Sequence, residues 1–391
     1  MKGPLEGLLV LDLTRVLAGP YATMMLADYG ANIYKIEPPE VGDDSRAFGP
    51  FVGKESAYFM SLNRNKRSIV LDFKKPSNVE IFKEMVKKAD IVVENYKPGT
   101  MEKFGLGYDV LEKINPKIIY AACSGFGHSG PYMLKPAYDI IVQAMGGIMS
   151  ITGPEGGEPT RVGASVGDVI AGIFTSNAIM IALYHLTQTG QGQKIDVSML
   201  DCQVAVLENA IARFVTSGSV PEPIGNRHPS ITPFASFTAK DGYLIIGAGN
   251  ERLWEKFCKV MGKPEWMQDP RYATNALRTT NFKEMHQDIN DVVKHKTIAE
   301  WMDILEAASV PCAPINTVDR IVNDPQIQAR EMILEVEHPV AGNLKMPGVP
   351  VKMSKTPGSV RTPAPMLGQH TNELLQEMFG WDESTISEKL K

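Results

Sequence analysis

Cysteine is scarce in this chain of 391 residues, which contains only four, and no two of them form a C-x-x-C pair. Their wide separation argues against a disulfide framework and a structural zinc site, and it fits a reducing compartment. The seven histidines also lack H-E-x-x-H or comparable ligand spacing. We therefore expect a cytoplasmic protein that holds no metal ion.

Long apolar runs and a strong net charge are also lacking. No uninterrupted apolar run of about 18 residues is apparent, and Asp12, Arg15 and Gly19 interrupt the N-terminal stretch. The sequence therefore predicts neither a membrane-spanning helix nor a signal peptide. The net charge of -5 gives no support to nucleic-acid binding. We expect no membrane partner and no nucleic-acid partner.

The common nucleotide and hydrolase motifs are absent as well. The first predicted strand is followed by TRVLAGP instead of G-x-G-x-x-G, and the chain has neither a P-loop nor a G-x-S-x-G turn. A pattern of alternating strands and helices is therefore no evidence for NAD, for ATP or for a serine nucleophile, since fold does not fix chemistry.

What the chain does contain is the pattern of an α/β protein. The composition, 43% hydrophobic and 22% charged, is typical of a folded domain, and the length favours two lobes. Short β-type runs alternate with helical intervals, which predicts a mostly parallel sheet covered by helices. The predicted strands are 7–13, 32–37, 68–72, 90–94, 117–123 and 194–197, and the predicted helices are 22–29, 76–89, 108–114, 168–186 and 200–215.

A segment rich in proline and glycine, 217–233, interrupts this pattern and is predicted to be a linker. Beyond it, a hairpin over 237–247 and helices near 251–261, 281–294 and 297–308 predict a smaller α+β domain. We therefore expect a large, Rossmann-like domain made of residues 1–216 and 331–391, and a small domain of residues 234–330.

Seven segments carry a more specific signal. In their order and spacing they resemble the class III CoA-transferases, the family of formyl-CoA transferase and carnitine CoA-transferase. The segments are LAGPYATMMLADYGANIYKIE (17–37), LNRNKRSIVLDFK (62–74), VVENYKPGTMEKFGLGYDVL (92–111), SGFGHSGPY (124–132), AYDIIVQAMGGIMSITG (137–153), VGASVGDVIAG (162–172) and GQGQKIDVSMLD (190–201).

This resemblance implies a CoA-transferase that moves CoA from an acyl-CoA donor, such as succinyl-CoA, to a free carboxylic acid. It implies that CoA thioesters are substrates, and that no cofactor is permanently bound. It also implies a homodimer whose two subunits are threaded through each other. Periodicity alone could not have indicated such an interlocked assembly.

Asp168 matches the nucleophilic aspartate of the family. From its local sequence alone, Asp168 is a helix-capping carboxylate at the start of a long apolar helix. The two roles are compatible, because a helix N-terminus favours the ionised form. An ionised carboxylate can attack a thioester carbonyl. The resemblance implies a mixed anhydride and then an aspartyl-CoA thioester as intermediates.

Basic stretches supply candidates for the CoA phosphates. The alternative is that these side chains form solvated surface clusters. By family position, the residues that match CoA-binding ones are Leu71, Lys74, Asn95, Tyr96 and Lys103, and Arg64 lies in the same basic stretch as Lys74. Lys103 stands where formyl-CoA transferase has arginine, so it keeps the charge without the planar fork.

Tyr138 and Asp139 match positions that face the active site, although the local pattern alone predicts only a helix start. The related α-methylacyl-CoA racemases have a proton-shuttling histidine near position 138, so Tyr138 favours transfer over racemisation. Arg46 is a candidate anchor for a substrate carboxylate. Leu17 stands where formyl-CoA transferase has glutamine, which argues against formate and oxalate as the acid pair.

Gly247 and Gly249 match the glycine-rich loop that covers the nucleophile in the family; locally they could form a plain strand-to-helix turn. Three other functions are weighed against CoA transfer. A racemase on the same fold is the main alternative. A non-catalytic CoA-binding subunit is opposed by Asp168 within its motif, and a dehydrogenase is opposed by the missing dinucleotide motif.

Overall fold

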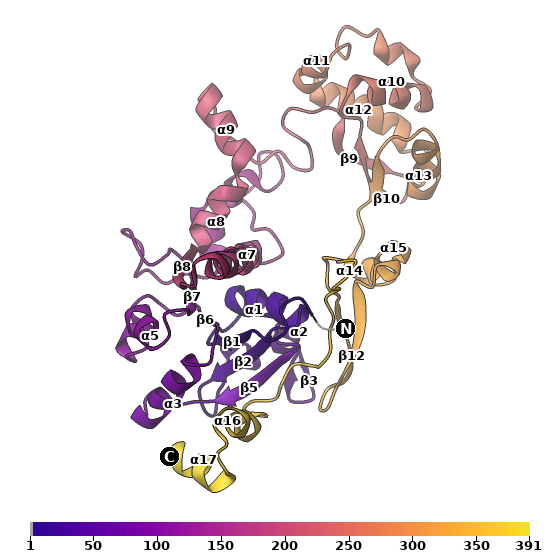
Figure 1. Cartoon of the computed structure of the whole chain (residues 1–391). Helices are drawn as coiled ribbons and strands as arrows, with labels where there is room; N and C mark the ends of the chain where they lie inside the picture. The colour runs from indigo at the N-terminus through magenta and orange to yellow at the C-terminus, as the bar shows by residue number, and fades with distance from the viewer. Residues whose placement is uncertain (1–2) are drawn as a thin grey trace. The chain divides into compact units, whose positions relative to one another are not determined.

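The computed structural model describes residues 3–391, apart from the side chain of Glu208, and divides them into two compact units. Unit 1 comprises residues 3–149, 161–218 and 325–391, and unit 2 comprises residues 150–160 and 219–324. Figure 1 shows both units along the chain.

A six-stranded, fully parallel sheet forms the centre of unit 1, with the strand order β5-β2-β1-β6-β7-β8. Its strands are β1 (Leu9–Asp12), β2 (Asn32–Glu37), β5 (Lys66–Val70), β6 (Ile91–Glu94), β7 (Ile119–Ser124) and β8 (Gln193–Ser198). All six predicted strands are present. The strand predicted over 68–72 lies two residues earlier, because its pairing with β2 begins at Lys66.

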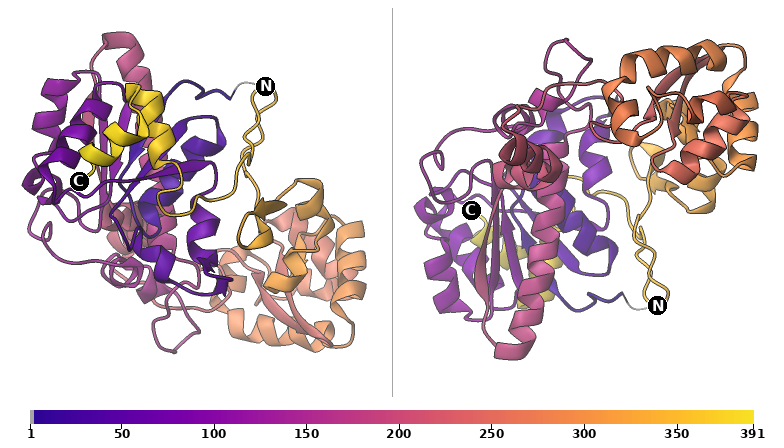
Figure 2. Two further views of the ribbon diagram at one scale, coloured as in Figure 1. Left: turned by 90° about the horizontal axis from the view of Figure 1, so that it is seen from below. Right: turned by 90° about the horizontal axis from the view of Figure 1, so that it is seen from above.

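Helices cover both faces of this sheet, as alternation of side chains along each strand requires. Val10, Ile91 and Ile119 pack under α1 and α7, whereas Leu11, Val92 and Tyr120 pack under the helices of the opposite face. Figure 2 shows the sheet between its two helix layers. The helices are α1 (Ala18–Asp28) and α7 (Val166–Thr189) on one face, and α3 (Pro76–Val86), α4 (Thr100–Lys103), α5 (Tyr108–Ile114), α16 (Thr371–Phe379) and α17 (Glu383–Lys389) on the other.

The close crossing of α1 and α7 depends on a glycine. A Cβ atom at Gly172 would lie 2.7 Å from the carbonyl oxygen of Ala18 and 3.1 Å from the ring of Tyr21. Contacts that short do not occur between real side chains and backbone, so only glycine permits this approach. The N-terminus of α7, which carries Asp168, is thereby placed beside the start of α1.

Further short elements of unit 1 lie around this core. They are η1 (Asp44–Ala47), β3 (Phe51–Val52), β4 (Glu55–Ser56), α2 (Ala57–Leu62), α6 (Asp139–Met145), α8 (Met199–Val206), α9 (Glu208–Ser217), α15 (Pro325–Ala329), β12 (Ile333–His338) and β13 (Gly342–Pro347), with η2 (Met149–Ile151) at the unit boundary. The single helix predicted over 200–215 is two helices, because the chain leaves the helical path at Leu207.

Unit 2 has its own core around a three-stranded antiparallel sheet, β11-β10-β9. The predicted hairpin is confirmed by the pairing of Gly242 with Ala239. Its elements are β9 (Phe234–Ala239), β10 (Gly242–Gly247), α10 (Glu251–Val260), η3 (Pro264–Met267), α11 (Asn275–Thr280), α12 (Phe282–Val293), α13 (Ile298–Ala307), β11 (Cys312–Pro314) and α14 (Val318–Ile321).

The boundaries of the two units differ from those predicted. Residues 150–160 join unit 2, where Glu155 pairs with Arg227 at 3.5 Å and the amide of Gly225 donates to the carbonyl of Gly153 at 2.9 Å. These partners lie about 70 residues away in sequence, and no local pattern could indicate them. At the other end, residues 325–330 belong to unit 1.

One helix among the described residues, α7, is long and apolar enough to cross a membrane by length and composition, although polar residues such as Asp168 and Asn177 interrupt its apolar run. Its face containing Ala171, Thr175 and Ile179 is buried within unit 1, as in the core helix of a folded domain. Its other face leaves Ile173, Phe174, Met180, Ile181 and Tyr184 exposed on the single chain.

Arg64, predicted to contact CoA, is instead part of the framework of unit 1. Its guanidinium is buried and donates to Asp28, with the shorter contact at 2.7 Å, and to the carbonyl of Pro347. It thus joins the end of α1 to the returning C-terminal segment.

Replacing Arg64 with methionine should lower the free energy of unfolding by about 3 to 5 kcal/mol, because it leaves a buried carboxylate unpaired. Arg67→Met, three residues along the chain, is the matched control. Arg67 pairs with exposed Glu373 and Glu377, so its loss should cost less than about 1 kcal/mol. Urea unfolding measures the free energy of unfolding of each variant, and an equal decrease in the two variants would contradict the structural role of Arg64.

Candidate active site

The sheet has a topological switch point between β1 and β6, where the chain order reverses and the loops after the two strands diverge. A cavity of about 270 Å³ lies there, at the carboxyl ends of β1, β6 and β7. Its lining comes from seven separate parts of the chain and includes Arg15, Leu17, Asn95, Tyr96, Lys97, Cys123, Ser124, Lys135, Tyr138, Asp168 and Met199.

Asp168 lies in this cavity, in the first turn of α7. It is the third helical residue, and the N-cap position is occupied by Ser165. The local interpretation of Asp168 as the helix cap is therefore wrong. Within the described part of the chain its carboxylate makes no side-chain hydrogen bond, so both oxygens are available to a substrate.

Asp139 makes the contacts that a capping residue would make. Its Oδ1 accepts a hydrogen bond from the amide of Gly167 at 2.9 Å. Its Oδ2 accepts hydrogen bonds from the guanidinium of Arg161 at 3.0 Å and from the side-chain amide of Gln143 at 2.8 Å. Asp139 is buried, and its carboxylate ties α6, the loop before α7 and the start of α7 together. It positions Asp168 and is not itself among the lining residues.

Burial raises the pKa of Asp168 to about 7, the nearby Asp139 carboxylate adds to the rise, and Arg161 opposes it. Although a helix N-terminus favours the ionised form, the pKa of Asp168 is above its usual range, chiefly because the carboxyl group is buried. A carboxylate whose pKa lies near neutrality is a better nucleophile than an ordinary one while still being ionised in a large fraction of molecules.

Two residues near Asp168 were missed by the sequence reasoning. Burial and, less strongly, the charges of Asp168 and Asp139 raise the pKa of the Tyr58 phenol to about 12, so Tyr58 keeps its proton at neutral pH. Ser124 lines the cavity at the end of β7, and its buried hydroxyl has no hydrogen-bond partner among the described residues. Tyr58 lies outside the seven family segments, and Ser124 begins the segment SGFGHSGPY, in which nothing marked its hydroxyl as functional.

Cys123 is the other potential nucleophile in the cavity wall. Burial raises the pKa of its thiol to about 12, so the reactive thiolate is scarce at neutral pH. Asp168 is therefore the better candidate nucleophile of the two.

A second cavity, of about 310 Å³, adjoins the first, and both are lined by Arg15, Tyr96 and Lys97. It also contains Leu71 and Lys74, two of the residues predicted to hold CoA. An apolar wall with a cation at its rim suits the adenine and phosphate ends of such a molecule.

The remaining predicted CoA residues have different positions. Asn95 lines the first cavity, and its side-chain amide bonds both the N–H and the C=O of Arg15, at 2.9 and 2.8 Å. Lys103 is exposed at the end of α4, whose first residue, Thr100, lines the second cavity. Arg64 lines neither cavity, because Asp28 and Pro347 hold it.

Arg46 is also engaged elsewhere. Its guanidinium makes two hydrogen bonds of 2.7 Å with Glu37 and lies 3.6 Å from the ring centre of Phe59. A substrate carboxylate would have to displace a buried acidic partner to reach it. Tyr138, in contrast, is 71% exposed and lines the cavity beside Asp168.

Gly247 and Gly249 lie in unit 2, at the end of β10, so their predicted closure over the nucleophile stays a prediction. Close packing within unit 2 accounts for glycine at both positions. A Cβ atom at Gly247 would lie 3.1 Å from the ring of Phe234, and one at Gly249 would lie 2.9 Å from a methyl group of Ile231.

The residues that the structure describes contain no group of three or more histidine, cysteine or acidic side chains that could hold a metal ion. No histidine is among the described residues that line the first cavity. His128, the nearest in sequence to Tyr138, lies beside Glu94 at 3.6 Å instead. The proton-shuttling histidine of a racemase thus has no counterpart in the cavity.

Comparison with known proteins agrees with this site. Residues 5–371 match the model of CoA-transferase family III. The chain is 41% identical to human succinyl-CoA:glutarate CoA-transferase, over 99% of this chain and 89% of that protein. It is 46% identical to acetyl-CoA:oxalate CoA-transferase from Acetobacter aceti, over 90% of each chain.

Comparison of the fold with solved structures points to the same family. A crystal structure of a CAIB/BAIF family protein from Brucella suis superposes with a TM-score of 0.87 at 36% identity, covering 97% of this chain and all of that one. With both the sequence and the fold matched over nearly the whole length, this chain belongs to CoA-transferase family III and is an enzyme that transfers CoA.

Proposed function

We propose that the enzyme transfers CoA from a dicarboxylic acyl-CoA, such as succinyl-CoA, to a free dicarboxylic acid, with Asp168 as the covalent nucleophile. The observation that carries the proposal is a carboxylate with a pKa near 7 and no side-chain hydrogen bond, in a cavity at the switch point of the sheet. The names of the human and Acetobacter relatives contain glutarate and oxalate, which are both dicarboxylic acids.

The first half of the reaction loads CoA onto the enzyme. An oxygen of Asp168 attacks the thioester carbonyl carbon, the C–S bond breaks, and CoA leaves as its thiolate, so that a mixed anhydride remains. The thiolate then attacks the side-chain carbonyl carbon of Asp168. The anhydride C–O bond breaks, the donor acid leaves as a carboxylate, and an Asp168–CoA thioester is formed.

The second half reverses these steps with the acceptor. The acceptor carboxylate attacks the Asp168 carbonyl carbon and expels the CoA thiolate, which then attacks the acceptor carbonyl carbon. The new thioester departs and the Asp168 carboxylate is restored. No water, proton or ATP is consumed, and each bond broken is replaced by one of similar energy.

The cavity can support this chemistry with its other groups. The buried hydroxyl of Ser124 lines the cavity and has no hydrogen-bond partner among the described residues, so it can donate to the oxyanion that forms at each addition. The second cavity, with Leu71, Lys74 and Tyr96, is the proposed site for the nucleotide end of CoA.

Racemisation is not favoured, because the relatives described above are named as transferases and no histidine lines the cavity in the described part of the chain. We also propose that the active species is a homodimer. The exposed apolar stripe on α7, Ile173, Phe174, Met180, Ile181 and Tyr184, occupies one face of a 24-residue helix, and a second copy of the chain would bury it.

Asp168→Asn should abolish transfer, because the amide oxygen is a poor nucleophile. With succinyl-CoA alone, intact-protein mass spectrometry should detect a CoA adduct at Asp168 in the unmodified protein and none in the variant. Asp201→Asn is the matched control, since Asp201 holds the same third position in α8 but is exposed. Transfer that survives in Asp168→Asn would refute the nucleophile while leaving CoA transfer itself intact.

The pH profile tests the environment of Asp168. Only its ionised form attacks, so kcat/KM for the acyl-CoA should fall about tenfold per pH unit below the pKa of about 7 and level off above it. Arg161→Gln should move the midpoint to higher pH, because the cation that stabilises the ionised form is lost. A profile that stays flat from about pH 5 to about pH 9 would contradict the raised pKa.

Light scattering tests the assembly. The enzyme should elute with twice the mass of one chain, and Ile181→Glu combined with Tyr184→Glu should reduce the dimer fraction or the yield of soluble protein. Val110→Glu is the control, since Val110 is an exposed apolar residue of α5 on the opposite face of the sheet. A monomer of full activity would contradict the dimer without affecting the proposal for Asp168.

A further inference from the structure

The loop between β1 and α1 has a strained backbone that buried charges hold in place. Val16 has φ = 66°, a left-handed conformation that a β-branched residue rarely adopts. Its N–H donates to Asp43 at 3.0 Å. Such strain persists only where surrounding contacts overdetermine the backbone, and it is concentrated at functional sites.

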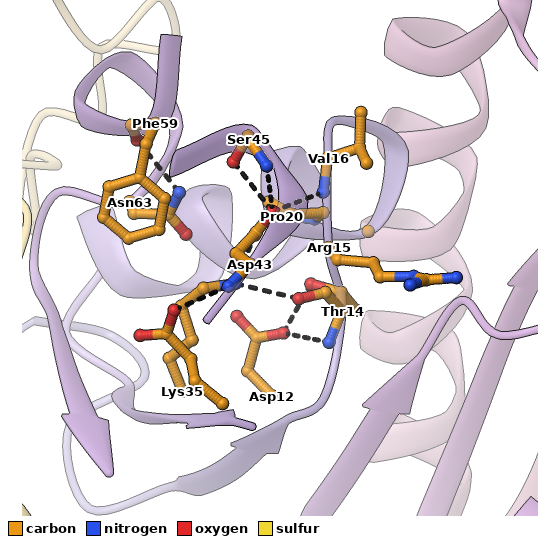
Figure 3. A network of polar contacts seen from close by, with 12 residues as sticks. Asp12, Thr14, Arg15, Val16, Pro20, Lys35, Asp43, Ser45, Phe59 and Asn63 are labelled. Carbon is orange, nitrogen blue, oxygen red and sulfur yellow. Dashed lines mark hydrogen bonds and ion pairs between the residues drawn. The ribbon is translucent and has the colours of Figure 1, made fainter. Parts of the chain in front are cut away.

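The buried pair of Lys35 and Asp43 supplies these contacts, as Figure 3 shows. Nζ of Lys35 lies 2.8 Å from Oδ2 of Asp43 and donates to the carbonyl of Thr14 at 2.8 Å. Both side chains are almost fully buried. Burial opposes ionisation of each, but their attraction holds the pKa of Asp43 well below its usual range and raises the pKa of Lys35. The loop is therefore anchored on both sides of Arg15.

Arg15 is the charged residue that this loop presents to the cavity. Its main chain is bonded to Asn95 in both directions, so the Cα position is fixed relative to the loop after β6. Its side chain is 49% exposed, pairs with Asp44 at 3.0 Å and lies 5.5 Å from the ring centre of Tyr96. The guanidinium thus has an open side within the cavity that contains Asp168.

Three cations line this cavity among the described residues, namely Arg15, Lys97 and Lys135. Lys135 lies over the ring of Tyr132, 3.9 Å from its centre, on the irregular segment before α6. Of the three, only Arg15 has both a planar fork of donors and a backbone fixed by buried charges. A planar fork matches a carboxylate through two parallel hydrogen bonds.

We propose that Arg15 binds the second, non-reacting carboxylate of a dicarboxylic substrate while the first carboxylate reacts at Asp168. This inference rests on the proposed function, and it assigns the discrimination between dicarboxylic and monocarboxylic acids to one side chain. Asp44 holds the guanidinium in the absence of substrate. Because that ion pair is half exposed, a substrate carboxylate can replace Asp44 at little energetic cost.

Matched acids of equal chain length test the inference. Glutarate and valerate, or succinate and butyrate, differ only in the second carboxylate. In the proposed mechanism the acceptor reacts in a separate half-reaction, so kcat/KM for the acceptor is independent of how succinyl-CoA binds. Arg15→Met should lower kcat/KM for the dicarboxylic member by about 10- to 100-fold, as expected for losing hydrogen bonds to a charged group, and change that for the monocarboxylic member less than about threefold.

Arg67→Met is the control, because Arg67 also pairs with carboxylates and lies over a tyrosine ring but lines none of the cavities described above. Arg67→Met should leave the ratio of the kcat/KM values for the two acids unchanged. Arg15→Lys keeps the positive charge without the planar fork, so the preference in kcat/KM for the dicarboxylic acid should be lost only in part. This variant provides the test if Arg15→Met does not fold.

Three outcomes are distinguishable. An equal loss for both acids would overturn the inference and assign Arg15 to CoA phosphates, since Arg15 also lines the second cavity. Values of kcat/KM that stay unchanged for both acids would overturn it outright. If the unmodified enzyme transfers CoA to none of the acids, the proposed function fails, whatever the variants do.

Discussion

The buried ion pair between Lys35 and Asp43 is the interaction on which the active edge of this enzyme depends. Parallel strands end at one edge of the sheet, where their last carbonyls and the following loops need partners. Lys35 and Asp43 supply partners to Thr14 and Val16 and so fix the path of the chain from β1 into α1. Removing one member would leave a buried charge unpaired, which is far more costly than the pair itself is favourable.

A second carboxylate extends this framework to the nucleophile. Asp139 bonds the first turn of α7 and so replaces a conventional cap, while its charge makes Asp168 harder to ionise. Asp139 thus fixes the position of Asp168 and adds to the rise in the pKa of Asp168 that burial causes. Asp139 matches an active-site position of the family, and the structure gives it a physical task that needs no contact with substrate.

The arrangement also explains why CoA transfer fits this fold. A switch-point crevice in a doubly wound sheet offers two adjoining cavities with a shared wall of Arg15, Tyr96 and Lys97. One cavity contains the carboxylate of Asp168, and the other contains apolar and cationic residues that suit a nucleotide. In the proposed mechanism the CoA thiolate is released twice and each time attacks a carbonyl carbon, first that of Asp168 and then that of the acceptor, so holding the far end of CoA would keep the thiolate close while the acids exchange.

The sequence by itself determined the α/β class, the positions of the strands along the chain and the family, and it singled out Asp168 as the candidate nucleophile, because these follow from local periodicity and from contiguous motifs. Only the tertiary structure decided which charged residues are free for substrate. Arg64 and Arg46 looked equivalent to other basic residues, yet Asp28 and Glu37 engage them, whereas Arg15, in an ordinary loop, opens into the cavity. The partners of a charged side chain come from strands and loops far along the chain, and burial then sets its pKa, so neither is encoded in the neighbouring sequence.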